Sequence, residues 1–374
     1  MASGESQSKG RIAIIGAGYV ADLYLASLCA FPEIEIVGVW DRDAARLAHF
    51  AAHWSLPALA GFEAVVEARP DIILNLTNPS SHAAVTRRAL EAGLHVWSEK
   101  PLALEIDEAI ALTELAKARG LHLASAPCSV LGRAAQTLWR AVRDGRIGRP
   151  RLVYAELDDD FVSSAPFRRW FSASGAAWPA DDEFRTGCTL EHAGYYLSWL
   201  MAIFGPVRRV VGGSARCLDE EQTGAGHAAP DYASATLYFD AMVARLTCSI
   251  VARHDHRLRI FGDDGILEVA DAWANGAAVR VRRRHVVRRR LVNSPIARRV
   301  PWAGDGHPML GRRGAASMNF ALGVAEMMRA IAAGRSPRLA GDFALHLTEA
   351  SLAMQMGGDH RMATSFDAME PMRW

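Results

Sequence analysis

Short apolar segments alternate with amphipathic ones over the first third of the chain. The apolar runs predict strands at 11–15, 33–40, 71–77, 94–98 and 121–126. Between them, helices are expected directly after Gly18, after Asp41 to about residue 53, and at 62–68, 82–92 and 106–119. Repeated strand-helix units with right-handed crossovers form a doubly wound parallel sheet. The pattern therefore predicts an α/β fold that begins with a Rossmann-type domain.

The pattern changes beyond residue 127, where strands no longer alternate with helices. Strands are predicted at 151–158, 207–215, 232–239, 242–250, 257–261 and 265–269, with helices at 134–144, 190–204, 320–333 and 342–356. Short loops between several of the strands indicate antiparallel pairing. We expect a disordered tail at 1–10, a dinucleotide-binding domain at 11–127, and an α+β domain at 128–374 whose largely antiparallel open sheet is covered by helices on one face.

Composition adds limits on partners and location. The chain has 374 residues and a net charge of +1, so no global charge draws it to nucleic acid or to a membrane. The five cysteines are scattered and form no Cys-x-x-Cys pair, which indicates reduced thiols in a cytoplasmic protein. No apolar run is long enough to span a bilayer. His254 and His256 have no nearby ligands at zinc spacing, so we expect no metal site.

The first predicted strand runs directly into the turn Gly16-Ala17-Gly18-Tyr19-Val20-Ala21 and then into a helix. In a dinucleotide-binding turn, Gly16 permits the tight bend, Gly18 leaves room for a pyrophosphate, and Ala21 lets the helix pack closely. The helix N-terminus favours phosphate. Such turns also occur for backbone reasons alone, so the assignment to a dinucleotide site depends on the strand that follows.

That second strand ends at Asp41, where an acidic residue binds the adenosine ribose in this kind of domain. Asp41 favours NAD, while the neighbouring Arg42 leaves NADP open because a guanidinium pairs with a 2′-phosphate. The alternative is that Asp41 only caps the helix that starts near Asp43. Ligands are also expected where the later strands end. The residues at these strand ends are Thr77, Asn78, Pro79, His82, Ser98, Glu99, Lys100 and Pro101.

Several motifs together carry a family resemblance over nearly the whole chain. They are Gly16-x-Gly18-x-x-Ala21, Thr77-Asn-Pro-x-x-His82, Ala92-Gly93-Leu-His-Val96, Glu99-Lys100-Pro101 and Ala330-Ile-x-x-Gly334-Arg-x-Pro337. With them the chain resembles the glucose-fructose oxidoreductase / inositol dehydrogenase (Gfo/Idh/MocA) family. The resemblance implies a nicotinamide-dependent oxidoreductase of sugars, nucleotide sugars or cyclitols, with a second-domain sheet that forms a homodimer or homotetramer interface.

One part of the chain departs from the family pattern. The family usually carries Asp-x-Gly-x-His on a second-domain helix, and its histidine transfers the proton. Here His192 stands at the Asp position and Tyr196 at the His position. Residues four apart share a helix face, so we expect Tyr196 to act as the acid, with His192 orienting it. Glu191 and Tyr195 are the alternative pair on another face.

Lys100 is the predicted electrostatic partner of Tyr196, because it follows a strand end beside the expected nicotinamide. Partial burial near a positive ring predicts a lowered pKa for this lysine. Arg169 and Trp170 are predicted to contact the cofactor, although a solvated loop with an aromatic anchor is equally compatible. Asp182 is predicted either to bind substrate hydroxyls or to cap a turn.

Residues 280–299 carry a run of arginines with no acidic residue between Asp271 and Asp305. This run favours an exposed hairpin or a subunit-facing insertion over a nucleic-acid site. The main prediction is an NAD(P)-dependent oxidoreductase that interconverts a hydroxyl and a ketone on a sugar-like substrate. Two alternatives remain open: an NAD-dependent glycoside-cleaving enzyme with transient oxidation, and a regulatory protein that binds the dinucleotide without turnover.

Overall fold

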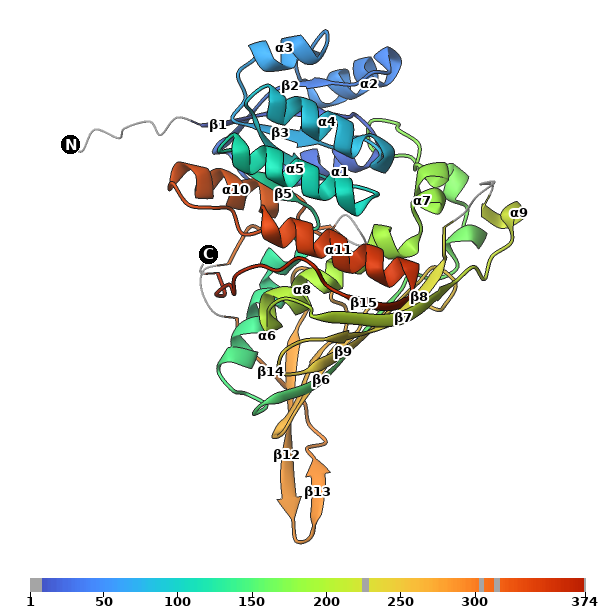
Figure 1. The fold of residues 1–374 in the computed structure, drawn as a ribbon, viewed down its shortest axis with the longest axis vertical. Coiled ribbons are helices and arrows are strands. Elements are labelled where there is room, and N and C mark those ends of the chain that lie inside the picture. The colour runs from blue at the N-terminus through green and yellow to red at the C-terminus, as the bar shows by residue number, and fades with distance from the viewer. Residues whose placement is uncertain (1–8, 224–228, 303–305, 313–316, 373–374) are drawn as a thin grey trace, which may run out of the picture.

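In the computed structural model, residues 9–223, 229–302, 306–312 and 317–372 are described, and they form two sheets with helices around them (Figure 1). Most of the predicted disordered tail lies outside these residues. The first domain alternates strands and helices, as the apolar pattern predicts. In chain order its elements are β1 (Gly10–Ile15), α1 (Tyr19–Leu28), β2 (Ile34–Trp40), α2 (Ala44–Trp54), α3 (Phe62–Glu67), β3 (Ile72–Asn75), α4 (Pro79–Glu91), β4 (His95–Ser98), α5 (Ile106–Ala118) and β5 (Leu123–Ser125).

Within the described residues, five parallel strands form the first sheet in the order β2-β1-β3-β4-β5. The chain reverses direction across the sheet at β1, so the ends of β1 and β3 face a crevice in which ligands bind in such folds. Helix α4 begins at Pro79, three residues before the predicted start at His82. Proline fits the first helical position because its missing N–H has no partner there anyway.

The second domain is built on a larger, mixed sheet. Its strands are β6 (Pro150–Asp158), β7 (Arg209–Ala215), β8 (Tyr232–Tyr238), β9 (Val243–Ser249), β10 (Leu258–Gly262), β11 (Gly265–Val269), β12 (Val279–Val287), β13 (Arg290–Asn293), β14 (Arg298–Arg299) and β15 (Gly358–Arg361). The order is β13-β12-β11-β10-β6-β9-β8-β7-β15, with β14 beside β12. Only the β6–β9 pair is parallel among these described strands. The predicted α/β fold with a largely antiparallel second sheet is confirmed.

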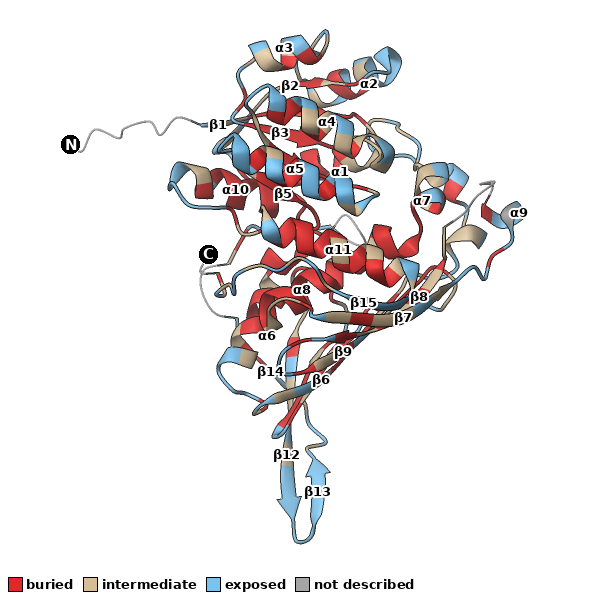
Figure 2. Cartoon of the chain, viewed as in Figure 1, coloured by how far each residue is buried: buried red, intermediate tan, exposed pale blue. Residues whose placement is uncertain are grey.

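Helices cover one face of this sheet (Figure 2). The helices of the second domain are α6 (Arg133–Arg143), α7 (Ala180–Thr186), α8 (Gly194–Phe204), α9 (Glu220–Thr223), α10 (Leu322–Ala332) and α11 (Asp342–Met356). Along β6 and β8, buried residues alternate with more exposed ones, which is the period of a strand with one covered face. Helix α11 contacts both α5 and β7, so it joins the two domains.

The arginine run forms a hairpin of β12 and β13 that projects from the end of the sheet (Figure 1). Its outer residues are exposed, in agreement with the predicted exposed hairpin. All five cysteines are free thiols. Among the described residues, no helix has the length and apolar character to span a membrane.

Candidate active site

A cleft of about 900 Å³ lies between the two domains. Its first-domain wall consists of the turn after β1 and the segments after β3 and β4. Its second-domain wall includes Asp159, several residues between 162 and 184, residues of the turn before α8 and its first turn, and Trp273. Of the residues that the sequence singles out, the cleft is lined by Gly18, Tyr19, Val20, Thr77, Asn78, Pro79, His82, Glu99, Lys100, Trp170, Asp182 and His192.

Glycine is present at positions 16 and 18 of the first turn for different structural reasons. Gly16 has a φ of +103°, and a Cβ there would lie 2.6 Å from the Leu76 carbonyl carbon, so the backbone itself requires glycine. Gly18 has an ordinary φ of −81°, and a Cβ there would meet nothing within 4 Å. Neither packing nor conformation of the protein requires glycine at position 18. The open space beside it, at the N-terminus of α1, fits the pyrophosphate of a dinucleotide.

Asp41 stabilises this turn. Its carboxylate accepts hydrogen bonds from Ala17 N and from Asp43 N, both at 2.8 Å. Asp43 is the residue that caps α2, through a 3.0 Å bond from Arg46 N. Asp41 and Arg42 do not line the cleft, whereas Arg46 does, and sequence analysis missed it. Contact of Asp41 or Arg42 with a ribose or a 2′-phosphate stays a prediction.

His82 connects two loops of the cleft wall. Its ring nitrogens lie 2.7 Å from the Pro101 carbonyl oxygen and 2.8 Å from the Thr77 carbonyl oxygen. Burial lowers the pKa of His82, although the two carbonyls partly oppose this. Because both nitrogens are occupied by backbone, His82 holds the segments after β3 and β4 together. Direct contact with a cofactor stays a prediction.

Lys100 extends from the end of β4 to the opposite wall of the cleft. Its Nζ forms a close ion pair with Glu191 Oε2, and the two side chains are 17% and 3% exposed. The neighbouring Glu99 is held firmly: its carboxylate accepts from Lys100 N at 3.0 Å and from Tyr24 Oη at 2.7 Å. Trp97 Nε1 in turn donates to Tyr24 Oη at 2.8 Å. These contacts fix the backbone from which Lys100 projects.

The charges around Lys100 reverse the expected direction of its pKa. Burial alone would lower the pKa, but the carboxylates of Glu191 and Glu183 raise it well above its ordinary value. The prediction that the pKa of Lys100 is lowered is therefore wrong, and its side chain is an ammonium group. Burial and the carboxylate of Glu191 raise the pKa of Glu183 well above its ordinary range. Glu183, from α7, had no signal in the sequence.

Tyr196 does not reach the cleft, which corrects the predicted pairing with Lys100. It is 2% exposed, and its hydroxyl donates to the His256 carbonyl oxygen at 2.7 Å. The alternative residues Glu191 and Tyr195 line the cleft instead, with His192. A π-helical turn at Thr189–Ala193 precedes α8. Glu191 and Tyr195, four residues apart, are the pair on the side of Lys100, and Tyr196 points away from it toward His256.

The loop around Trp170 gives a mixed outcome. Phe167, Arg168 and Trp170 line the cleft, but Arg169 does not, so its predicted cofactor contact is not supported. Trp170 packs edge-on against Trp178 within an aromatic cluster of this wall. Asp182 accepts a close hydrogen bond from Asn78 Nδ2 and so links the two domains across the cleft. Its predicted contact with substrate remains untested.

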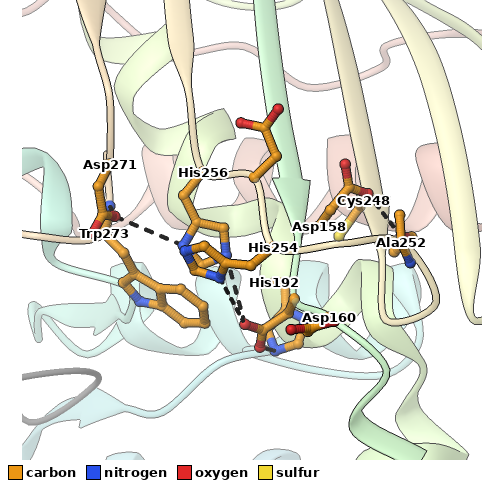
Figure 3. Close-up of polar contacts among 12 residues, drawn as sticks. Asp158, Asp160, His192, Cys248, Ala252, His254, His256, Asp271 and Trp273 are labelled. Atoms are coloured by element: carbon orange, nitrogen blue, oxygen red, sulfur yellow. Dashed lines mark hydrogen bonds and ion pairs between the residues drawn. The ribbon is translucent and has the colours of Figure 1, made fainter.

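His254 and His256 have a third partner that the sequence spacing concealed. Asp159 follows β6, almost a hundred residues earlier, and the three side chains bring possible ligand atoms within 4.8 Å of one another. The expectation that these histidines lack a ligand set is therefore wrong. Figure 3 shows His254, His256 and His192 converging on one point, with Asp271 behind His256.

Comparisons with known proteins agree with the fold. A family model described as the oxidoreductase family (GFO_IDH_MocA) with an NAD-binding Rossmann fold matches residues 10–126. A second, the GFO/IDH/MocA C-terminal domain, matches residues 135–268.

Curated relatives match parts of the chain. The UDP-N-acetylglucosamine 3-dehydrogenase of Acidithiobacillus ferrooxidans is 33% identical over 146 residues, which is 39% of this chain and 44% of that protein. The dTDP-3,4-didehydro-2,6-dideoxy-alpha-D-glucose 3-reductase of Saccharopolyspora spinosa is 35% identical over 116 residues, 30% of this chain and 35% of that protein. The chain thus spans less than half the length of these relatives.

Solved structures match over the whole fold. The A. ferrooxidans dehydrogenase aligns with a TM-score of 0.68 and 24% identity, covering 93% of this chain and 97% of that one. A levoglucosan dehydrogenase solved with NADH and levoglucosan aligns with a TM-score of 0.75 and 17% identity, covering 92% and 96%. At these identities the alignments establish the fold alone.

Proposed function

Because the chain belongs to the Gfo/Idh/MocA oxidoreductase family, we propose that it interconverts a hydroxyl and a ketone on a sugar, nucleotide sugar or cyclitol, with NAD as cofactor. The observation that carries this proposal is the Lys100 ammonium group, held by Glu191 at the end of β4 inside a cleft that also contains the dinucleotide turn. A protein that only bound the dinucleotide would not need this buried ion pair.

The residues of the first domain fit a dinucleotide. The backbone of Gly18 to Val20 and the N-terminus of α1 would hold its pyrophosphate, and Arg46 would attract its adenosine end. When bound, the nicotinamide accepts or returns the hydride. The protein's own residues then have to manage the hydroxyl proton at the same carbon.

Lys100, Glu191 and Glu183 supply that proton transfer. During ketone reduction, the ammonium of Lys100 gives a proton to the carbonyl oxygen, and the resulting amine regains a proton through Glu183, the neighbouring carboxyl group whose pKa is raised by burial. In the oxidative direction the proton leaves the substrate hydroxyl for the same chain of groups, and the positive charge stabilises the developing alkoxide. This assignment replaces Tyr196 with Glu191 and Glu183. Tyr195, beside Lys100, is left to bind substrate.

The second-domain wall favours a polyhydroxylated substrate. The indole of Trp273 lines the cleft, and its Nε1 is buried without a hydrogen-bond partner among the described residues. An unpaired buried donor is costly unless a ligand accepts from it. Trp170, Trp178 and Phe167 add apolar ring surface to the same wall, on which the C–H faces of a sugar can pack.

The test is a turnover assay with a matched lysine control. The purified protein is incubated with NAD⁺ or NADP⁺ and a panel of nucleotide sugars, monosaccharides and cyclitols, and formation of the reduced cofactor is followed by absorbance. Lys100→Met should lower kcat by roughly 10²-fold to 10⁴-fold, the typical contribution of a general acid or base. Lys117→Met, which removes an exposed lysine on α5, should leave kcat unchanged.

Three outcomes would contradict the proposal. Full activity of Lys100→Met would remove the assigned proton donor. Release of a free sugar without net reduced cofactor would instead indicate glycoside cleavage by transient oxidation. Dinucleotide binding without turnover of any panel member would favour a regulatory role.

A further inference from the structure

The cluster of Asp159, His254 and His256 lies at the edge of the cleft, outside the group around Lys100. Its arrangement follows from strand register. Asp158, the last residue of β6, pairs with Asp255 through hydrogen bonds of 3.1 and 3.0 Å. Asp159 is thereby opposite His254, and His256 is two residues further along the same segment, just before β10. Cross-strand partners and residues two apart point to the same face, so all three side chains project together.

The three side chains meet at distances that hydrogen bonds do not explain. Asp159 Oδ1 is 3.6 Å from His256 Nε2 and 3.9 Å from His254 Nδ1. N–H···O hydrogen bonds are shorter, at about 2.7 to 3.2 Å. His256 Nε2 is buried and has no hydrogen-bond partner among the described residues, and His256 itself is 2% exposed. A buried nitrogen aimed at a carboxylate without a bond to it indicates a missing ligand between them.

Asp271 lies behind the ring of His256. Its Oδ1 is 3.7 Å from His256 Nδ1, on the side of the ring away from Asp159, and it accepts a hydrogen bond from Trp273 N at 3.0 Å. Figure 3 shows this line from Asp271 to His256. A carboxylate behind a histidine ring is the arrangement that orients metal-binding histidines and keeps the other nitrogen available. Tyr196 adds support by holding the His256 carbonyl oxygen.

We propose that Asp159, His254 and His256 bind a divalent transition-metal ion of the Zn²⁺ class. Two imidazoles and one carboxylate suit zinc, cobalt or nickel, whereas magnesium and calcium prefer oxygen ligands. Three protein ligands leave one position open, as in catalytic zinc sites. Asp159 lines the cleft, so the open position faces the substrate space and takes an oxygen of a hydroxyl, carboxylate or phosphate group.

His192 connects this site with the Lys100 group. Its Nε2 is 3.9 Å from Asp159 Oδ2, the carboxylate oxygen that does not face the other two histidines. Its Nδ1 is buried without a hydrogen-bond partner among the described residues. His192 thus follows Glu191 in the chain but faces Asp159, whereas Glu191 faces Lys100.

The test measures metal binding to the untagged full-length protein, after removal of metal with a chelator and in the absence of dinucleotide and substrate. Zn²⁺ is titrated by competition with a chromogenic chelator, and Co²⁺ by its visible absorption, which reports the coordination geometry. We expect one ion per chain. His254→Ala and Asp159→Asn should each weaken Zn²⁺ binding by at least about tenfold. Azide should change the Co²⁺ spectrum because it occupies the open position.

The control is His285→Ala, which removes an exposed histidine from β12 and should bind Zn²⁺ like the natural protein. His254 is 53% exposed, so its removal should leave the metal-free melting temperature unchanged, and this variant decides the question if Asp159→Asn does not fold. Equal Zn²⁺ binding by all variants, or no binding above buffer, would overturn the proposal. Since no dinucleotide is involved, that result would leave the proposed function intact.

Discussion

Removing the ammonium group of Lys100 should destabilise the protein through its partner. In Lys100→Met, the carboxylate of Glu191, only 3% exposed, stays in the cleft wall without its cation. Breaking a buried ion pair from one side costs about 3 to 5 kcal/mol, because the remaining charge is left in a poorly solvated position. Lys100 keeps 17% exposure, so the lower end applies, about 3 kcal/mol. For a chain of 374 residues that lowers Tm by roughly 4 °C, because the entropy of unfolding is about 2.1 cal/mol/K per residue.

The loss should depend on pH in a defined direction. Removing Lys100 takes away the cation that lowers the pKa of Glu183, so this pKa, already raised by burial and by Glu191, rises further. A carboxyl group whose pKa is raised on folding contributes stability that is complete below its unfolded pKa of about 4.3. This contribution is lost as pH rises through the folded-state pKa. The stability difference between Lys100→Met and the natural protein should therefore shrink as pH falls toward 4 and be greatest above neutrality.

A double variant separates charge from packing. Lys100→Met with Glu191→Gln removes both charges and should recover most of the lost stability, since uncharged replacements of a buried pair are often neutral. It should not recover turnover. The assay is thermal unfolding followed by circular dichroism from pH 5 to 8, for the natural protein, both single variants and the double variant. A double variant less stable than Lys100→Met, or a Tm loss independent of pH, would refute the reasoning.

Three further predictions test other parts of the structure. Gly18→Ala should change the free energy of unfolding by no more than about 0.5 kcal/mol yet weaken NAD⁺ binding in a calorimetric titration, whereas Gly16→Ala should destabilise the fold itself because of its φ of +103°; equal stability losses would contradict the distinction. Tyr196→Phe should retain kcat and lose about 1 kcal/mol of stability with its hydrogen bond to His256, while Tyr195→Phe should change KM or kcat, and the opposite pattern in steady-state kinetics would restore Tyr196 as the acid. Burial lowers the pKa of His346 to about 4. The neutral ring therefore contributes roughly 3 kcal/mol to the free energy of unfolding, which is complete above pH 6.5 and is lost as pH falls toward 4. In urea unfolding at a series of pH values, His346→Gln should reduce this loss of stability at acid pH, and an unchanged loss would count against the reasoning.

The sequence predicted what depends on local pattern. The turn from Gly16 to Ala21 and the position of Lys100 after β4 follow from an apolar run that ends at polar residues, because parallel strands place their carboxyl ends at one edge. The strands that became β6 to β11 also followed from apolar segments bounded by short loops, whereas the edge strands β14 and β15 were not predicted. These features require only neighbours in the chain, so one sequence suffices to find them.

Contacts between distant segments could not be found in that way. Glu183 has no motif, and it becomes relevant only because α7 is packed beside Glu191. Arg46 is in the first turn of α2, shortly after Asp41. Only the folded cleft shows that Arg46 faces the ligand space and that the Asp41 carboxylate accepts a hydrogen bond from Ala17 N. The assignment of Tyr196 failed because residues 191 and 195 share one helix face and residues 192 and 196 share another, and only the packed structure shows which face meets Lys100.

The π-helical turn before α8 also explains how one cleft can contain two separate charge systems. Its consecutive residues point in different directions, so Glu191 faces Lys100 while His192 faces Asp159. A substrate in the cleft therefore meets a cationic proton donor on one side and the carboxylate-histidine group on the other. If the first acts on the reacting hydroxyl, the second is free to hold another oxygen of the same molecule and so to select which hydroxyl reacts. Substrates lacking that second oxygen should then lose kcat/KM in the natural protein but much less in His254→Ala.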